Sequence, residues 1–163
     1  MLTIREAGPA DTGELAAMNK QLIEDEKHDN PMTLPQLEDR MKGFLSGDYV
    51  ALLAIGEGVA GDCDCDGDSA AEEGADGQSV AVGYALIRKT AEPPYLRQFF
   101  ICRGERRKGY GRQFFAKLLE YLGTDAIDIE VMAWNEAGKA FWESLGFKPR
   151  SIYMRYDGGS RGE

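Results

Sequence analysis

A glycine turn between an apolar run and a helical pattern most constrains how this chain can fold. The turn Arg106-Arg107-Lys108-Gly109-Tyr110-Gly111-Arg112 follows Phe99-Phe100-Ile101, a run that is typical of a strand buried on both faces. The apolar residues after the turn recur at helical spacing and predict a helix over 109–122. The first N–H groups of a helix lack acceptors and its dipole attracts negative charge. The turn therefore predicts an anion site, and a pyrophosphate is the ligand that suits it best.

Two other phosphate-binding motifs do not fit this turn. A P-loop ends in Gly-Lys-Ser/Thr, which is missing here, and the dinucleotide-binding motif needs a third glycine where Phe114 stands. The alternative to an anion site is a solvated basic helix start.

The other elements follow from apolar spacing and from residues that start or stop helices. Helices are expected over 12–26, with Asp11-Thr12-Gly13-Glu14 as a capping box, from Thr33-Leu34-Pro35-Gln36 to Gly47, and over 135–145. Strands are expected over 2–6, 49–55, 80–88, 95–102 and 127–132, with one or two more in 147–156. This order predicts an α/β (α+β) fold with helices packed on one mixed sheet.

Residues 56–79 form an acidic segment that is rich in Gly, Ala, Asp and Glu and has no aromatic residue. Such a composition buries too little apolar surface to offset its ordering entropy. We therefore expect a mobile insertion, at about 56–79, within one domain spanning 1–163. The spacing from Asp62 to Glu73 also satisfies the EF-hand pattern, but no helical pattern flanks it, and a solvated insertion is the favoured interpretation. Cys63, Cys65 and His28 are too few for a tetrahedral zinc site, so no metal site is expected.

The net charge of −9 argues against a nucleic-acid-binding protein, which usually carries a basic face. No apolar stretch reaches the roughly eighteen residues of a membrane-spanning helix. The odd number of cysteines and the absence of a signal-peptide core predict a reducing, cytoplasmic location.

Two motifs, taken together, resemble the GNAT superfamily of N-acyltransferases. Arg106-x-x-Gly109-x-Gly111 resembles its acetyl-CoA signature, Gln/Arg-x-x-Gly-x-Gly/Ala. Residues 135–147, Asn-Glu-Ala-Gly-Lys-Ala-Phe-Trp-Glu-Ser-Leu-Gly-Phe, resemble its Asn…Phe-Tyr-Glu-x-Leu-Gly-Phe segment. The resemblance implies a mostly antiparallel central sheet with helices on both faces, a splayed strand pair, and acetyl-CoA as the co-substrate.

The resemblance also implies site residues. Backbone groups of residues 99–101 would bind the acetyl carbonyl and the pantetheine arm, and an N–H there would stabilise the oxyanion. N–H groups of residues 107–112 would hold the pyrophosphate, Asn135 would contact pantetheine, and two aromatic side chains would line the sulfur end. The implied cofactor-binding residues are Phe99, Phe100, Ile101, Arg106, Arg107, Lys108, Gly109, Tyr110, Gly111, Arg112, Asn135, Phe141 and Trp142.

The reaction needs a neutral amine, so a base must remove a proton at neutral pH. Many similar proteins carry a glutamate on the strand that contacts the acetyl group, but this chain has Tyr95, Arg97 and Gln98 there. Ribosomal-protein N-terminal acetyltransferases place a glutamate five residues before the motif asparagine, and Glu130 occupies that position. Glu130 is therefore the predicted base, and its alternative is an outward-facing strand residue.

Two further roles depart from the family pattern. Trp142 replaces the usual tyrosine acid, and an indole N–H is not a useful acid near neutrality. Either Tyr153 or Tyr156 substitutes, or the thiolate leaves without an acid. For the acceptor, the acidic residues near Glu26 would suit a cation, whereas Arg97 would bind a carboxylate. The alternatives are a solvated helix end for the acidic residues and a structural ion pair for Arg97.

The sequence thus predicts an acetyl-CoA-dependent N-acetyltransferase. It would transfer acetyl directly, in a ternary complex, to a primary amine of a small molecule or of a protein N-terminus or lysine. One rival is a non-catalytic acyl-CoA-binding module, and another is a calcium-responsive interaction protein that uses residues 56–79. Neither a nucleic acid nor a membrane is expected as a partner, and a homodimer is an open expectation.

Overall fold

The computed structural model describes residues 2–56 and 80–158. The predicted acidic insertion and the EF-hand pattern within it therefore lie outside the described residues, apart from Gly56. The chain divides into two compact units, Met1–Met132 and Ala133–Glu163. No helix in the described part of the chain is long and apolar enough to cross a bilayer.

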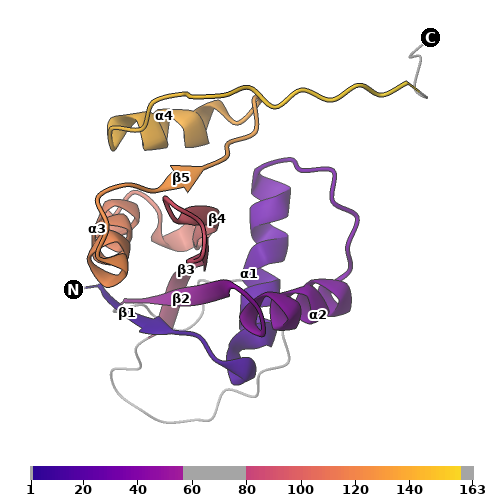
Figure 1. The fold of residues 1–163 in the computed structure, drawn as a ribbon. Coiled ribbons are helices and arrows are strands. Elements are labelled where there is room, and N and C mark those ends of the chain that lie inside the picture. The colour runs from indigo at the N-terminus through magenta and orange to yellow at the C-terminus, as the bar shows by residue number, and fades with distance from the viewer. Residues whose placement is uncertain (1, 57–79, 159–163) are drawn as a thin grey trace. The chain divides into compact units, whose positions relative to one another are not determined.

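The first unit is built on a five-stranded sheet in the order β1-β2-β3-β4-β5 (Figure 1). Neighbouring strands are antiparallel except β4 and β5, which are parallel. The mixed, mostly antiparallel sheet that the sequence predicts is thereby confirmed. The strands are β1 (Thr3–Glu6), β2 (Tyr49–Gly56), β3 (Val80–Arg88), β4 (Tyr95–Ile101) and β5 (Asp128–Ile129).

Helices cover both faces of this sheet, as expected. Helices α1 (Thr12–Asp25) and α2 (Leu34–Leu45) share a core with β2, β3 and β4, in which Leu53, Tyr84 and Phe100 face Leu15 and Met41. Helix α3 (Tyr110–Leu122) packs on the opposite face, where the ring centres of Phe99 and Phe114 lie 5.1 Å apart. Two short 3-10 turns, Pro9–Asp11 and Arg103–Glu105, connect elements of this unit. The second unit contains α4 (Glu136–Ser144).

Of the two predicted helix-start signals, one is confirmed and one is wrong. Gln36 N–H donates to Thr33 Oγ1 (3.4 Å), and Thr33 N–H donates to Gln36 Oε1 (2.8 Å), which is a capping box. Asp11 makes no cap bond to α1, because its own backbone is already helical and an N-cap needs an extended one. Its carboxylate instead accepts the N–H of Gly8 (2.8 Å) and pairs with Arg5 (2.8 Å).

Three strand predictions need correction. The strand expected over 127–132 is reduced to two residues, and none forms in the described part of 147–156. In that tail Ile152, Tyr153, Met154 and Tyr156 are 79–94% exposed. A strand exists only where a neighbour completes its hydrogen bonds, so β-forming residues alone do not create one. In β4 only Phe100 of the run 99–101 is fully buried, while its two neighbours are half-buried.

The close approach of β3 and β4 gives a stability prediction. A Cβ on Gly83 would lie 2.2 Å from the carbonyl oxygen of Phe100, whereas a Cβ on Gly43, on the surface of α2, would meet nothing within 4 Å. We expect Gly83→Ala to lower the free energy of unfolding by about 2–3 kcal/mol through overpacking. Gly43→Ala, the control, should raise it by about 0.5–1 kcal/mol. Urea unfolding of both variants tests this, and equal effects would contradict it.

Candidate functional site

Strand β4 loses its neighbour β5 after its second residue. The parallel ladder pairs Tyr95 with Asp128 and Leu96 with Ile129, and it ends there. From Gln98 to Ile101 the strand continues in register with β3 only. This is the splayed strand pair implied by the family resemblance. An edge of this kind can accept an extended ligand as if it were a further strand.

The hydrogen-bond alternation in β4 decides which backbone groups face the splay. Cys102 N–H donates to Val82 O at 2.8 Å, so Val82 and Cys102 form a hydrogen-bonded pair. Because such pairs alternate along an antiparallel ladder, Tyr84 and Phe100 form the next one. The backbone groups of Phe99 and Ile101 then point away from β3. Of residues 99–101, only Phe99 and Ile101 can therefore offer backbone groups to a ligand in the splay. The N–H and C=O of Phe100 are directed at β3.

The glycine turn has the backbone shape of an anion site. Arg107 and Gly109 have φ angles of 64° and 81°, and few non-glycine residues adopt such a positive value. Turns that contain left-handed residues can direct neighbouring N–H groups into one concavity. No described backbone carbonyl accepts from the N–H groups of Arg107, Gly109, Tyr110 or Gly111. The turn can thus offer several donors to an anion, and the pyrophosphate remains a prediction.

Two of the turn's cations are already paired with carboxylates. Lys108 Nζ lies 3.0 Å from an oxygen of Glu105, whose side chain is only 4% exposed. Arg106 binds Asp25, and its Nε donates to the carbonyl oxygen of Ile101 at 2.9 Å. These side chains are therefore committed to shaping the turn, and a cofactor would depend chiefly on the backbone there.

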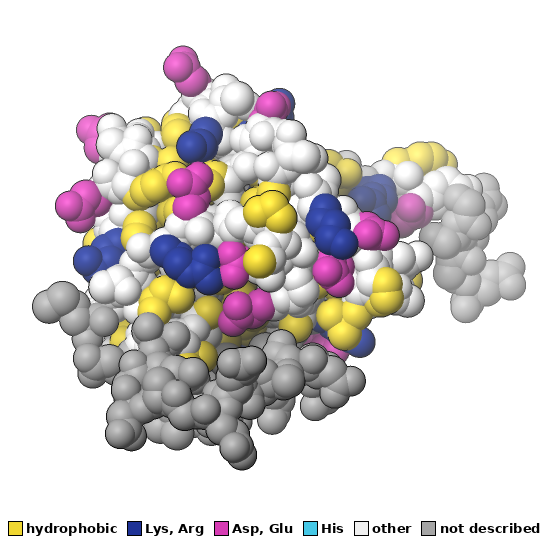
Figure 2. All heavy atoms as spheres, turned by 90° about the horizontal axis from the view of Figure 1, so that it is seen from below, with side chains coloured by type: hydrophobic (Ala, Val, Ile, Leu, Met, Phe, Trp, Pro, Cys, Tyr) yellow, Lys and Arg dark blue, Asp and Glu magenta, His cyan; other side chains and the backbone are white. Residues whose placement is uncertain are grey.

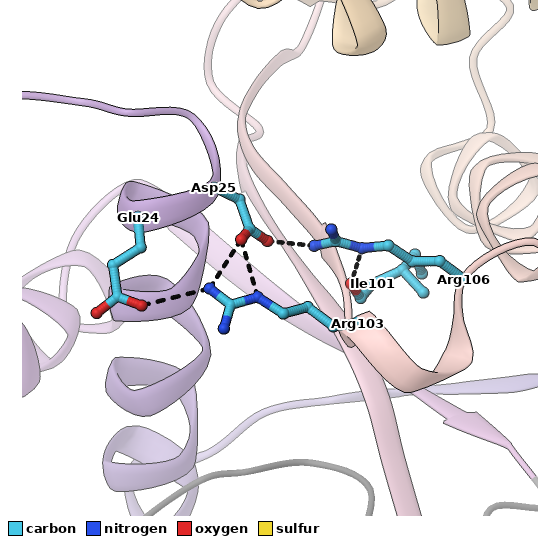
Figure 3. A network of polar contacts seen from close by, with 5 residues as sticks. All are labelled: Glu24, Asp25, Ile101, Arg103 and Arg106. Atoms are coloured by element: carbon cyan, nitrogen blue, oxygen red, sulfur yellow. Dashed lines mark hydrogen bonds and ion pairs between the residues drawn. The ribbon is translucent and has the colours of Figure 1, made fainter.

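Asp25 joins α1 to the end of β4. Its carboxylate accepts from both Arg103 (2.9 Å from Nε) and Arg106, and Glu24 lies 3.3 Å from Arg103 (Figure 3). Burial alone would raise the pKa of Asp25, but the hydrogen bonds from the two arginines more than offset it and lower that pKa. The C-terminal end of α1 is thus fixed beside the glycine turn.

A bulge in β4 turns Arg97 toward α2. Leu86 pairs with Gln98 but Ile87 pairs with Leu96, which leaves Arg97 as the extra residue. Its guanidinium carbon lies 5.1 Å from the ring centre of Phe44 and 6.0 Å from that of Tyr49. The structural ion pair considered for Arg97 is not formed with any described residue.

The face of β4 that carries Arg97 is the one covered by α1, and Glu26, the other predicted substrate residue, directly follows that helix. We call this the acceptor face: the side of β4 that α1 and α2 cover, formed by Tyr95, Arg97, Gln98 and Phe100. Burial raises the pKa of Glu26, which follows α1, and the charge of Asp25 adds to this while that of His28 opposes it. Besides burial, the charge of Glu26 also contributes to raising the pKa of Tyr84, which lies in the core between the sheet and helices α1 and α2.

Glu130, the predicted base, is exposed and accepts a hydrogen bond from the hydroxyl of Tyr95. Burial, the charge of Glu130 and this bond together raise the pKa of Tyr95 to about 12, against a smaller opposing effect of Arg97. The tyrosine is therefore protonated at any ordinary pH and can hold the carboxylate in one orientation. Glu130 lies one residue beyond β5, so it flanks the splay.

The second unit holds the remaining predicted residues. The side-chain oxygen of Asn135 accepts from Gly138 N–H at 3.0 Å and caps α4. Trp142 packs edge-on against Phe141 (4.9 Å) and Phe147 (5.3 Å). Tyr153, the predicted acid, is 79% exposed in the extended tail. These residues form a helix cap and an aromatic cluster within their own unit.

Other features of the described residues add no further residue to the candidate site. No group of three His, Cys, Asp or Glu side chains that could hold a metal occurs among the described residues. A cavity of about 530 Å³ lies near the start of β2, lined in part by Glu6, Lys42 and Lys89, away from the glycine turn. Basic and acidic side chains alternate on the face seen in Figure 2. Residues 57–79 hold eight acidic and no basic residues, which accounts for most of the net charge.

Sequence analysis missed three parts of the site. Arg40 and Tyr84 were not singled out, because an arginine on a helix and a tyrosine in an apolar strand are common. Tyr84 is fully buried, and its hydroxyl donates to Gln98 Oε1 at 2.9 Å. The partners of Arg106 were also missed, since Asp25 lies far from it in the sequence. A buried tyrosine hydroxyl usually needs a partner, which is the one signal that could have identified Tyr84.

The Asp25 contacts predict a pH-dependent stability. A carboxyl whose pKa is lowered on folding stabilises the protein above its unfolded pKa, near 3.9, and loses this effect as the pH falls through the folded value. We expect Asp25→Asn to lower the free energy of unfolding by about 1–2 kcal/mol at pH 7. The difference from wild type should shrink below about pH 4.

Urea unfolding at pH 7 and at low pH measures this difference. Glu24→Gln is the control, because its carboxylate is 54% exposed and its ion pair should contribute less than about 0.5 kcal/mol. A deficit in Asp25→Asn that persists unchanged at low pH would show that the ionised carboxylate is not its cause.

Solved structures share this fold. A possible acetyltransferase from Clostridium difficile 630 matches with a TM-score of 0.67 at 16% identity, covering 96% of this chain and 97% of that one. A predicted acetyltransferase with acetyl-CoA from Clostridium acetobutylicum gives a TM-score of 0.64 at 15% identity, covering 96% of both chains. At these identities the likeness concerns the fold alone.

Sequence comparison is more specific. Uncharacterized protein ML0378 of Mycobacterium leprae (strain TN) is 32% identical over 87 residues, which are 51% of this chain. This chain spans only about a quarter of the length of that relative, 24%. Residues 36–147, which include the glycine turn and the Asn135 segment, match the family described as acetyltransferase (GNAT). The chain belongs to the acetyltransferase (GNAT) family.

Proposed function

We propose that this protein transfers the acetyl group of acetyl-CoA directly to a primary amine in a ternary complex. The observation that carries the proposal is the meeting of two features in one unit: β4 separates from β5 after Leu96, and the glycine turn follows β4 directly. The first suits an extended pantetheine arm and the second a pyrophosphate. The solved relative from Clostridium acetobutylicum, described with acetyl-CoA, supports the choice of co-substrate.

The backbone supplies most of the binding in this proposal. N–H groups of residues 107–112 hold the pyrophosphate, and the backbone of Phe99 and Ile101 holds the pantetheine arm. An N–H of one of these two residues points at the position where negative charge develops on the acetyl oxygen. The co-substrate supplies the reactive thioester, and the strand orients it against the amine.

Glu130 is the base in this mechanism. Its exposed carboxylate takes the proton of the ammonium, directly or through water, while the Tyr95 hydroxyl fixes its orientation. Tyr153 is the proposed donor of a proton to the leaving thiolate, since Trp142 cannot be one. The ammonium becomes a neutral, nucleophilic amine only when its proton is removed. Glu130 is therefore the residue whose loss should lower turnover most.

A non-catalytic acyl-CoA-binding module is the second candidate. The feature that favours it is Trp142 at the position where similar proteins place their tyrosine acid. Such a module would bind acetyl-CoA but release no CoA with any amine, whereas the enzyme does both.

The first prediction concerns co-substrate binding. Side chains of glutamate at positions 109 and 111 would place two negative charges against the pyrophosphate and block the close approach of the backbone. Gly109→Glu/Gly111→Glu should therefore abolish micromolar binding of acetyl-CoA in isothermal titration. The control is the same exchange at Gly8 and Gly43, where an added Cβ meets nothing within 4 Å. Wild type that is folded but does not bind acetyl-CoA would refute the proposal.

The second prediction concerns the base. Glu130→Gln keeps the shape of the side chain but cannot accept a proton, so kcat should fall by about 10²–10⁴-fold. The dissociation constant of acetyl-CoA should not change. Tyr95→Phe should lower kcat less than Glu130→Gln does, because it removes the group that orients the carboxylate and not the base itself. The kcat of Tyr95→Phe should recover in part at higher pH. Glu120→Gln, an exposed carboxylate on α3, is the control. Unchanged turnover in Glu130→Gln would assign the proton transfer to another group.

A further inference from the structure

Two arginines from distant parts of the chain lie near the same phenylalanine ring on the acceptor face. The guanidinium carbon of Arg40, on α2, lies 5.6 Å from the ring centre of Phe44, and that of Arg97, on β4, lies 5.1 Å from the same ring. Their charges are close enough for Arg97 to lower the pKa of Arg40, in addition to the larger effect of burial. We call these two residues the arginine pair.

The arginine pair has no carboxylate partner in the part of the chain that the structure describes. No ion pair joins either guanidinium to a described Asp or Glu. Four other arginines of the same unit do have such partners, namely Arg5, Arg88, Arg103 and Arg106. Two neighbouring like charges without a counter-charge repel each other, and a bound anion would relieve this repulsion.

Arg40 is held rigidly but incompletely satisfied. Its Nη2 donates to Asn19 Oδ1 at 3.0 Å, while its Nε is buried and has no hydrogen-bond partner among the described residues. Asn19 in turn bonds the hydroxyl of fully buried Tyr84, which donates to Gln98 beside Arg97. A buried polar chain thus runs from one arginine to the strand that carries the other. It holds the guanidinium of Arg40, while that of Arg97 lies against the rings of Phe44 and Tyr49.

We propose that the arginine pair binds a carboxylate of the acceptor, so that the substrate is an amine that also carries a carboxylate, such as an amino acid or a peptide with a free C-terminus. This inference rests on the proposed acetyl transfer. Arg97 precedes Phe99 by two residues, which is about 7 Å along a strand. A small acceptor can therefore reach from the guanidinium groups to the splayed part of β4. The planar fork of an arginine matches the two oxygens of a carboxylate.

The substrate test uses matched amines. CoA release is measured with glycine, β-alanine, 4-aminobutyrate, lysine and a dipeptide, each as the free acid and as the primary amide. Amidation removes only the negative charge and keeps the shape. It also lowers the pKa of a nearby amine, which favours the amide, so a preference for the acid is the stricter outcome. For at least one pair we expect kcat/KM to be about 10- to 100-fold higher for the acid.

The variants test whether the arginine pair causes this preference. Arg40→Gln and Arg97→Gln should each raise KM for the preferred acid about 10-fold or more and change kcat little, because the contact exists before the reaction as well as during it. The matching amide should change less than about 3-fold. Arg5→Gln is the control, since β1 lies three strands from β4 in the same sheet, about 14 Å away. Acetyl-CoA affinity and the melting temperature verify that each variant folds.

A binding measurement separates this inference from the proposed function. The N-acetyl acids and N-acetyl amides are titrated into wild type and variants in the presence of CoA. If no amine is acetylated but the acids still bind through the arginine pair, the transfer proposal fails and the carboxylate site stands. Equal use or equal binding of acids and amides would overturn the inference. So would variants that keep the acid preference, or a stronger preference for O-phosphoethanolamine over β-alanine.

Discussion

The incomplete pairing of β4 is the constraint on which the rest of the site depends. On one side the strand is fixed to β3, so closely at Gly83 that an added Cβ would lie 2.2 Å from the carbonyl oxygen of Phe100. On the other side its ladder with β5 ends after Leu96. Because hydrogen bonds alternate along β4, the groups of Phe99 and Ile101 are directed to the side that β5 has left. A strand held on one side and open on the other presents backbone donors without losing its place in the fold.

Charges near this strand fall into two sets with different uses. Asp25 and Glu105 neutralise cations around the glycine turn, which leaves the turn's backbone as its main binding element. Arg40 and Arg97 have no such partners among the described residues, although the chain as a whole is acidic. Leaving two guanidinium groups unpaired has a cost, and proteins tend to retain unfavourable features of this kind at functional sites. The paired charges near the glycine turn therefore have a structural role, and the unpaired Arg40 and Arg97 are the ones that we propose bind a ligand.

Several features were predictable from the sequence because they depend on neighbours in the chain. The capping box at Thr33 and the helix after Gly109 arise from residues three or four positions apart. The base candidate and the aromatic residues of 135–147 came from the family resemblance and stay predictions. The missed parts depend on partners far away in the sequence. Plain alternation places Arg97 on the face opposite Phe100, and the one-residue bulge between Leu86 and Ile87 reverses this. Likewise the carboxylate of Asp11 pairs with Arg5 of the preceding strand β1 and does not cap α1.

The sequence by itself determined the order of elements, the glycine turn and the family, since these follow from apolar period, backbone freedom and motif spacing. The tertiary structure decided where β5 stops pairing and which N–H groups face the gap. It also decided that Arg40 and Arg97 meet over one phenylalanine ring. The physical reason is that strand register and the meeting of α2 with β4 are set by packing across the whole core. No local stretch of residues contains that information.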